Sequence, residues 1–349
     1  MAGRTAGSRL TPEEPTGSSP TAEPAVTIRE VEAADTSVVH ELTWEELEAH
    51  LRSDTQEWIH VSNVSNASLV RLSAILQIAP HNFRLDQVDD LWPHVGRVER
   101  SVLIFLQSGE IRYPTSTREF YTIARRGSIL LVQGPKVITM SPYGMDPMPR
   151  MTEYLQSGRA AGGAFAMRII EGWVSTTLRE HRDLLSEIEF EISAIGRTPR
   201  SRLPKDFLAR MYELQKAITR LSSNLVHLRE LITRLSSARM PLADVDDEAK
   251  SHFENLSDET GFLSEIAHEV SENVGTIIDV YINQSSFDTN RILKILAVIT
   301  AVAIIPATIG GLLGISSPYI VELWLVVLIT VLSMGFVMYC FLKLGWLRT

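Results

Sequence analysis

The residues of this chain that could bind a metal ion lie shortly before its most apolar stretch. They recur at spacings of three, four and seven, which places them on one side of a helix: Glu265, His268, Glu269, Glu272 and Asp279. Carboxylate oxygens suit Mg²⁺, and an imidazole beside them suits Zn²⁺. A solvated helix face has the same pattern, so the sequence leaves both interpretations open. We call these five residues the acidic face.

A second pattern follows further along the same helix. One face carries small and polar residues in steps of three or four: Asn290, Leu293, Ala297, Thr300 or Ala301, Ile304, Ala307 or Thr308, and Gly311. This small-residue face would fit the wall of a pore in a ring of copies, because polar groups inside a membrane occur where they line water or protein. Helix packing through a small-xxx-small pair, Gly310 and Gly314, explains the same periodicity.

Two uncharged apolar segments, Ile295–Ile315 and Leu323–Leu342, must position these residues. Each has about 20 residues, enough at roughly 1.5 Å per residue to cross a bilayer. The connector Ser316–Glu322 is too short to hold a domain, so the segments are expected to form a helical hairpin.

The charges that flank the hairpin predict its orientation. Arg291 and Lys294 precede the first segment, Lys343 and Arg348 follow the second, and the connector has no Lys or Arg. The positive-inside rule therefore places both ends of the chain in the cytoplasm, with the hairpin in an inner (cytoplasmic) or plasma membrane.

The helix that enters the membrane is expected to be very long. No Pro or strong turn signal lies between Asp247 and Pro306, so one helix of about 100 Å should run from the cytoplasm into the bilayer. Such a helix needs neighbours, and one hairpin cannot enclose a pore. Both considerations predict an oligomer.

The preceding residues show a mixed pattern up to about Tyr154 and a helical one from Arg168 on. A capping box at Thr43 and Glu46 marks a helix start. Strands are expected at Trp58–Val61, Val102–Leu106, Phe120–Ala124, Ile129–Val132 and Val137–Met140, with turns at Gly109, Gly127 and Gly134-Pro135. Helices are expected at Ala166–Ile195, at Lys205–Arg239 and from about Glu248.

The predicted fold class is an α/β cytoplasmic domain followed by long α-helices and a C-terminal two-helix transmembrane hairpin. The expected parts are a disordered tail (1–27), the α/β domain (28–165), a helical hairpin (166–246), the cytoplasmic part of the long helix (247–294), the first membrane helix (295–315), the connector (316–322), the second membrane helix (323–342) and a cytoplasmic tail (343–349).

Composition excludes several classes of function. The net charge of −9 and the lack of a basic stripe argue against nucleic-acid binding, and the single cysteine, Cys340, excludes cysteine-cluster metal sites. The residues before Ile28 contain no apolar run that could serve as a signal peptide.

No enzyme signature survives inspection. His181-Arg182-Asp183-Leu184 imitates a kinase loop but has Ile188 where Asn is needed and is expected to be helical, and Gly158–Gly163 lacks the Lys-Ser/Thr of a phosphate loop. We therefore expect neither catalysis nor an organic cofactor.

A resemblance gives these patterns a context. Tyr281-Ile282-Asn283, Asn290, Lys294, Pro306, Thr308 and Gly311-Leu312-Leu313-Gly314-Ile315-Ser316 together resemble the CorA family of divalent cation transporters, and Gly-Leu-Leu-Gly-Ile is similar to its ZntB branch. The similarity extends to Asp86–Leu106, Leu228-Arg229-Glu230 and the basic tail Lys343–Leu347.

The resemblance implies a homopentamer with a funnel-shaped cytoplasmic domain, its pore lined by the first membrane helix. Gly314-Ile315-Ser316 then takes the place of the family's Gly-Met-Asn signature at the outer mouth, so a hydroxyl replaces an amide carbonyl as the ligand. Asp279 matches the family's regulatory acid.

The predicted function is a membrane channel or transporter for divalent cations. Mg²⁺ and Zn²⁺ are the main candidates for the transported ion, and Co²⁺ and Ni²⁺ are further ones. The ion is the substrate and a candidate regulator. The expected partners are copies of the chain, the bilayer and the ions. The alternative is a membrane scaffold or regulator that kept the pentamer and lost the filter, favoured by Ser316. A membrane-tethered enzyme would need a polar pocket in the α/β domain.

Overall fold

The computed structural model describes residues 26–112, 122–141, 147–157, 164–198, 202–237, 247–314 and 323–343. They divide into two compact units, one made of Met1–Glu191 with Ala217–His268 and the other of Ile192–Lys216 with Glu269–Thr349. The predicted tail to residue 25, the glycine-rich stretch 158–163 and the connector 316–322 lie outside the described residues.

The first unit contains a seven-stranded sheet in the order β2-β1-β3-β7-β6-β5-β4. Only β3 and β7 pair in parallel among these strands. The strands are β1 (Thr27–Glu32), β2 (His40–Leu42), β3 (Glu57–Ser62), β4 (His94–Val98), β5 (Ser101–Arg112), β6 (Thr122–Gln133) and β7 (Lys136–Ser141).

The helices include the three long ones that the sequence predicts. The elements are α1 (Trp44–Arg52), α2 (Asn66–Leu76), η1 (Pro80–Asn82), η2 (Leu85–Asp90), α3 (Met148–Gln156), α4 (Phe165–Gly196), α5 (Phe207–Ser236), α6 (Asp247–Gly314) and α7 (Leu323–Lys343). The capping box of α1 is present at Thr43 and Glu46. Sequence reasoning missed β1, β2, β4, α2 and α3.

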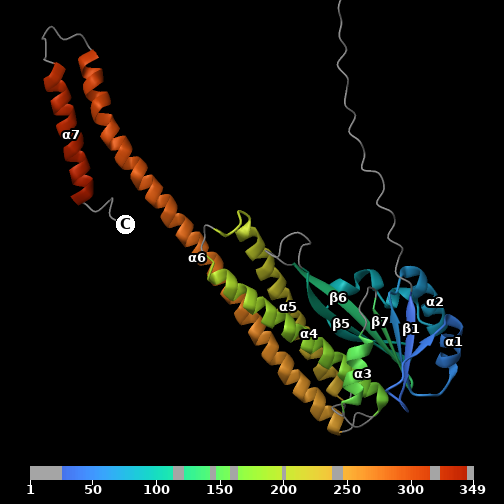
Figure 1. Ribbon diagram of the computed structural model, residues 1–349. Coiled ribbons are helices and arrows are strands. Elements are labelled where there is room, and N and C mark those ends of the chain that lie inside the picture. The colour runs from blue at the N-terminus through green and yellow to red at the C-terminus, as the bar shows by residue number, and fades with distance from the viewer. Residues whose placement is uncertain are drawn as a thin grey trace, which may run out of the picture. The chain divides into compact units, whose positions relative to one another are not determined.

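Helices cover both faces of the sheet, α1 and α2 on one side and α4 on the other (Figure 1). Successive side chains on a strand point to opposite faces, so Ile59 and Val61 enter the core beneath α1 and α2. Trp58 points the other way, where its ring meets Trp173 of α4 edge-on at 6.2 Å and its indole Nε1 donates to Thr139 Oγ1 at 2.9 Å. The sheet is thus buried on both faces.

The kinase-like stretch is part of a helix, as expected. His181 lies fully buried within α4, where its Nδ1–H donates to the carbonyl oxygen of Thr177 at 2.7 Å. Burial disfavours the charged imidazolium and lowers the pKa of His181. This histidine is a core residue of the helical layer.

Two of the three predicted glycine turns are wrong. Gly109 lies within β5 and Gly127 within β6, and only Gly134, with φ of 59°, forms the turn between β6 and β7. Gly127 is needed for a close approach instead. A Cβ there would lie 2.3 Å from the carbonyl oxygen of Val88, and its N–H donates to Asp89 Oδ1 at 2.6 Å.

We therefore expect Gly127→Ala to destabilise the α/β domain by about 1–3 kcal/mol or more, because backbone of η2 must move away from β6. Gly96→Ala in β4 is the matched control, since nothing lies within 4 Å of its added Cβ. Urea unfolding followed by tryptophan fluorescence measures the difference. Equal midpoints for the two variants would contradict the close approach.

Candidate functional site

The two predicted sites lie on one helix, α6, which is continuous for 68 residues and contains Pro306. Its buried side chains recur every three or four residues up to Ile278: Phe253, Leu256, Thr260, Leu263, Ala267, Val270, Val274 and Ile278. This spacing is that of one helix face packed on protein. Beyond Ile278, Val298 is the only buried residue of α6 among those whose burial the structure describes.

Near the point where this row ends, α6 packs against the start of α5. The rings of Phe207 and Tyr281 lie 5.0 Å apart, and a Cβ at Gly275 would come within 3.1 Å of the Gln215 amide. A mainly apolar pocket of about 300 Å³ adjoins them, lined by Phe207, Tyr281, Val280 and others. None of the described residues that line this pocket is charged.

The small-residue face lies in the part of α6 that its own chain leaves uncovered. Every residue of the face is exposed except Ala301, which is half-buried: Asn290, Leu293, Ala297, Thr300, Ile304, Ala307, Thr308 and Gly311. Among the described residues, no atom lies within 4 Å of a Cβ placed on Gly310 or Gly311, so α7 does not pack on these glycines. If the small residues serve helix packing, the partner must be another molecule.

The two threonine hydroxyls of this face form hydrogen bonds within the helix. The Thr300 and Thr308 hydroxyls donate to the carbonyl oxygens of Leu296 and Ile304, each at 2.8 Å. Their oxygen lone pairs stay available to accept hydrogen bonds. Pro306 has no N–H, which frees the carbonyl oxygen of Val302 one turn earlier. The face therefore offers oxygen acceptors without any charged group.

The predicted filter falls at the boundary of the described residues. Gly314 is the last residue of α6, and Ile315 and Ser316 lie outside the described range. Their role as a filter stays a prediction from the sequence.

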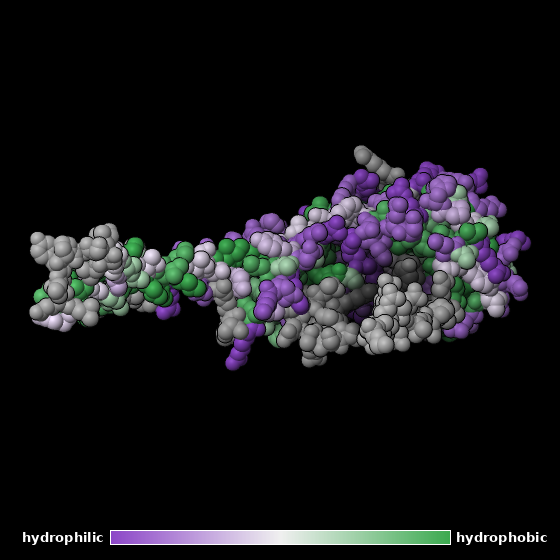
Figure 2. All heavy atoms as spheres, turned by 90° about the horizontal axis from the view of Figure 1, so that it is seen from above, coloured by the Kyte–Doolittle hydropathy of each residue, from purple (hydrophilic) through white to green (hydrophobic). Residues whose placement is uncertain are grey.

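Two helices in the described part of the chain are long and apolar enough to cross a membrane, one within α6 and the other α7. Only 6% of the most apolar window of α6 and 0% of that of α7 is buried within the chain. Figure 1 shows α7 running back in the direction opposite to the end of α6, and Figure 2 shows hydrophobic residues along both. Lipid or further protein has to cover this surface.

The acidic face consists entirely of exposed residues along α6: Glu265, His268, Glu269, Glu272 and Asp279. Its side chains do not converge on one point within the chain. In the described residues, the one group of three metal-binding side chains whose ligand atoms lie within 4.8 Å of one another is Glu30, His50 and Glu57, in the α/β domain. Any metal site on the acidic face needs ligands from another molecule.

Sequence reasoning missed the group of Glu30, His50 and Glu57. Glu30 and Glu57 lie on two strands that pair through β-sheet register, and His50 lies on the intervening helix. No local spacing brings the three together. One local signal is that Glu30 lies two residues after Ile28, and therefore on the same strand face as an apolar residue.

The two apolar helices, one of them within α6, fit a two-span membrane protein with a large α/β domain before the spans. Comparisons with known proteins identify its family. The profile of the family described as "CorA-like Mg2+ transporter protein" matches residues 53–343. The chain belongs to this membrane-embedded family of transporters and channels.

Individual relatives are distant. The cobalt/magnesium transport protein CorA of Thermotoga maritima is 26% identical over 140 residues, and the match spans 40% of this chain and 39% of that protein. The complete CorA magnesium transporter of Methanocaldococcus jannaschii has a similar fold, with a TM-score of 0.71 and 17% identity over 92% of this chain and 98% of that chain. The cytoplasmic domain of ZntB from Vibrio parahaemolyticus has a TM-score of 0.52 and 10% identity, and the match covers 75% of this chain and 98% of that domain.

If the small-residue face lines water, a cysteine on it should react with small water-soluble thiol reagents. We expect Ala297→Cys, Ile304→Cys and Ala307→Cys to be labelled in a Cys340→Ala background, because polar reagents reach water-lined positions. Ile295→Cys and Ile299→Cys, on the opposite side of the helix, are the matched controls and should react far more slowly. Mass spectrometry of labelled protein in liposomes measures the rates. Equal labelling of all five positions would show that the face only packs.

Proposed function

We propose that this chain is one subunit of a homopentameric channel or transporter for divalent cations, with Mg²⁺ or Zn²⁺ as the main candidates and Co²⁺ and Ni²⁺ as further ones. Five copies of α6 would surround the pore. Family membership supports the class of function. The ions in the name of the Thermotoga relative, cobalt and magnesium, support the choice of divalent ions.

The observation that carries the proposal is the uncovered small-residue face of α6. It lies in an apolar segment, presents hydroxyl oxygens from Thr300 and Thr308, and packs against nothing at Gly310 or Gly311. A divalent ion that keeps its water shell needs hydrogen-bond acceptors and space, and it needs no tightly binding carboxylate. A ring of such faces meets these requirements.

The flanking charges support a topology with both ends in the cytoplasm. Arg291 and Lys294 lie just before the first apolar segment of α6, and Lys343 ends α7. Under the positive-inside rule the α/β domain and the acidic face are then cytoplasmic. Ions that have crossed the pore would meet the acidic face on that side.

The alternative, a scaffold that kept the assembly and lost transport, is favoured by one observation. Ser316 stands where the family signature has Asn. Its hydroxyl is shorter than an amide and its oxygen is less polarised, so a ring of five would hold a hydrated ion less firmly.

Ion flux into liposomes separates the two functions. If the chain transports, wild type should admit Mg²⁺ or Zn²⁺ above empty liposomes. Ser316→Asn should then tighten Mg²⁺ selection, because a more polarised amide oxygen replaces the hydroxyl oxygen, and Ser316→Ala should reduce flux or selectivity, because the ring loses that oxygen. Native mass spectrometry should show pentamers for all three. Pentamers with flux equal to that of empty liposomes in all three would establish the scaffold function.

Regulation by the transported ion follows from the acidic face. A divalent ion held between Asp279 and Glu272 and a neighbouring subunit would stabilise the closed assembly by about 2.7 kcal/mol at a hundredfold excess over Kd. We expect Mg²⁺ or Zn²⁺ to protect the wild-type protein from protease, and Asp279→Ala with Glu272→Ala to weaken that protection.

The control for this experiment is Asp183→Ala with Glu189→Ala, two exposed acids on α4 that remove the same charge. Gel analysis of limited proteolysis with and without ion gives the readout. Should wild type and both double variants be protected equally, the acidic face is only a solvated surface.

A further inference from the structure

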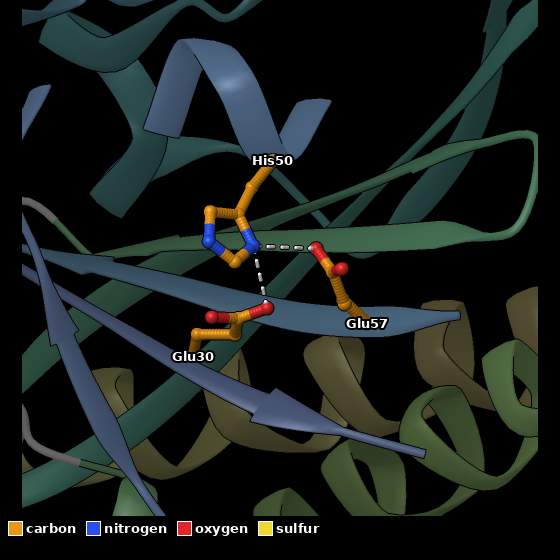
Figure 3. Close-up of side chains that lie close together, drawn as sticks. All are labelled: Glu30, His50 and Glu57. Carbon is orange, nitrogen blue, oxygen red and sulfur yellow. Dashed lines mark hydrogen bonds and ion pairs between the residues drawn. The ribbon is translucent and has the colours of Figure 1, made fainter. Parts of the chain in front are cut away.

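A cluster of buried charges lies in the α/β domain where the end of the sheet meets α1. Glu30 of β1 pairs in register with Ile59 of β3, which in turn pairs with Ile138 of β7, and both isoleucines belong to the core under α1 and α2. Alternation by two along β3 and β7 places Glu57 and Lys136 on that same face. His50, in the last turn of α1, lies above the two carboxylates (Figure 3).

The two carboxylates have unequal surroundings. Glu57 accepts from Lys136 Nζ at 3.0 Å and from the Thr55 hydroxyl. Although burial opposes ionisation, these hydrogen bonds lower the pKa of Glu57. The side chain of Glu30 is 2% exposed, and its Oε1 has no hydrogen-bond partner among the described residues. Burial and the neighbouring Glu57 charge raise the pKa of Glu30.

Three electron-pair donors therefore face one small space. His50 Nδ1 lies 2.9 Å from Glu30 Oε1 and 3.3 Å from Glu57 Oε2. A proton on Nδ1 can form a good hydrogen bond with only one of the two carboxylates. In the structure this hydrogen bond goes to Glu57, and Glu30 Oε1 has no hydrogen bond within the described part of the chain. A metal ion accepts all three at once. Donors around a tetrahedral Zn²⁺ lie roughly 3.3 Å apart, given bonds of about 2.0–2.1 Å.

We propose that Glu30, His50 and Glu57 bind one Zn²⁺ ion per chain in the α/β domain. An imidazole nitrogen with two carboxylate oxygens suits Zn²⁺, Co²⁺ or Ni²⁺, whereas Mg²⁺ prefers oxygen ligands alone. The site is separate from the acidic face and from the small-residue face, and it goes beyond the proposed transport function. All its ligands come from one chain, so it does not depend on assembly.

The surrounding residues fit such an ion. Lys136 Nζ donates to Glu57 Oε2 at 3.0 Å and to Ser53 Oγ at 2.9 Å, so its ammonium is held beside this carboxylate and offsets part of the negative charge. With a neutral imidazole, the two carboxylates and this ammonium leave one negative charge to attract a cation. The His50 side chain is 32% exposed, so solvent reaches one member of the cluster, and a water or hydroxide would be the fourth ligand of a tetrahedral ion.

Equilibrium dialysis of the purified full-length protein tests the proposal. After stripping with EDTA, the protein is dialysed against micromolar Zn²⁺ with millimolar Mg²⁺, and bound zinc is counted by mass spectrometry. Glu30→Gln and His50→Gln should each lose about one Zn²⁺ per chain relative to wild type, because three protein ligands hold the ion. His40→Gln, an exposed histidine of β2, is the matched control and should retain it.

Thermal unfolding supplies the second measurement. Zinc should raise the unfolding temperature of wild type and of His40→Gln but not of Glu30→Gln, while in EDTA Glu30→Gln should be at least as stable as wild type, because the neutral amide removes one of two neighbouring buried carboxylates. Equal zinc uptake and equal thermal shifts in all four proteins would overturn the proposal. Liposome flux is measured separately, so failure here leaves the proposed transport function untouched.

Discussion

The need to cover both halves of one helix governs this structure. From Phe253 to Ile278, α6 buries a residue every turn against its own chain. From Tyr281 onward, exposed side chains include Phe287, Leu293 and Ile304, and the apolar window is only 6% buried. An isolated helix gains little stability from propensity alone, so the apolar part of α6 needs lipid or further protein around it. Coverage of this surface is therefore a condition of the fold itself.

In the α/β domain the constraint is different, because the sheet is covered on both faces and its interior polar groups are removed from water. Polar groups in such an interior need partners. Asn224 of α5 donates to Gln107 of β5 at 2.5 Å, and Gln107 donates to the carbonyl oxygen of Asp89. Asp89 in turn accepts from the N–H of Gly127. These bonds tie α5 to β5 and tie η2 to both β5 and β6, which is why the close approach at Gly127 matters.

The helices of the C-terminal half could be predicted from local composition. The α/β domain was harder to predict, because its contacts depend on how distant strands pair. The apolar segments, the long helices and the capping box at Thr43 each depend on residues close in sequence, and all appear as expected. Gly109 and Gly127 look like turn residues locally, but they serve strand packing against distant segments. Glu30 and Glu57 meet only because β1 pairs with β3. No local pattern encodes that pairing. For the small-residue face, the sequence predicts its position on α6, but what covers it lies outside this chain.

Under the proposed functions the chain would use two kinds of oxygen ligand for opposite purposes. Along the small-residue face the acceptors are neutral hydroxyls already engaged with the helix, such as that of Thr308, so an ion would stay hydrated and leave readily. In the α/β domain the ligands are Glu30 and Glu57, each nearly fully buried. Burying two carboxylates with one lysine costs more desolvation than an apolar core would, so stability alone does not account for them. Charged, rigid ligands favour retention of an ion and neutral ones favour its passage, and the two arrangements lie in different parts of one chain.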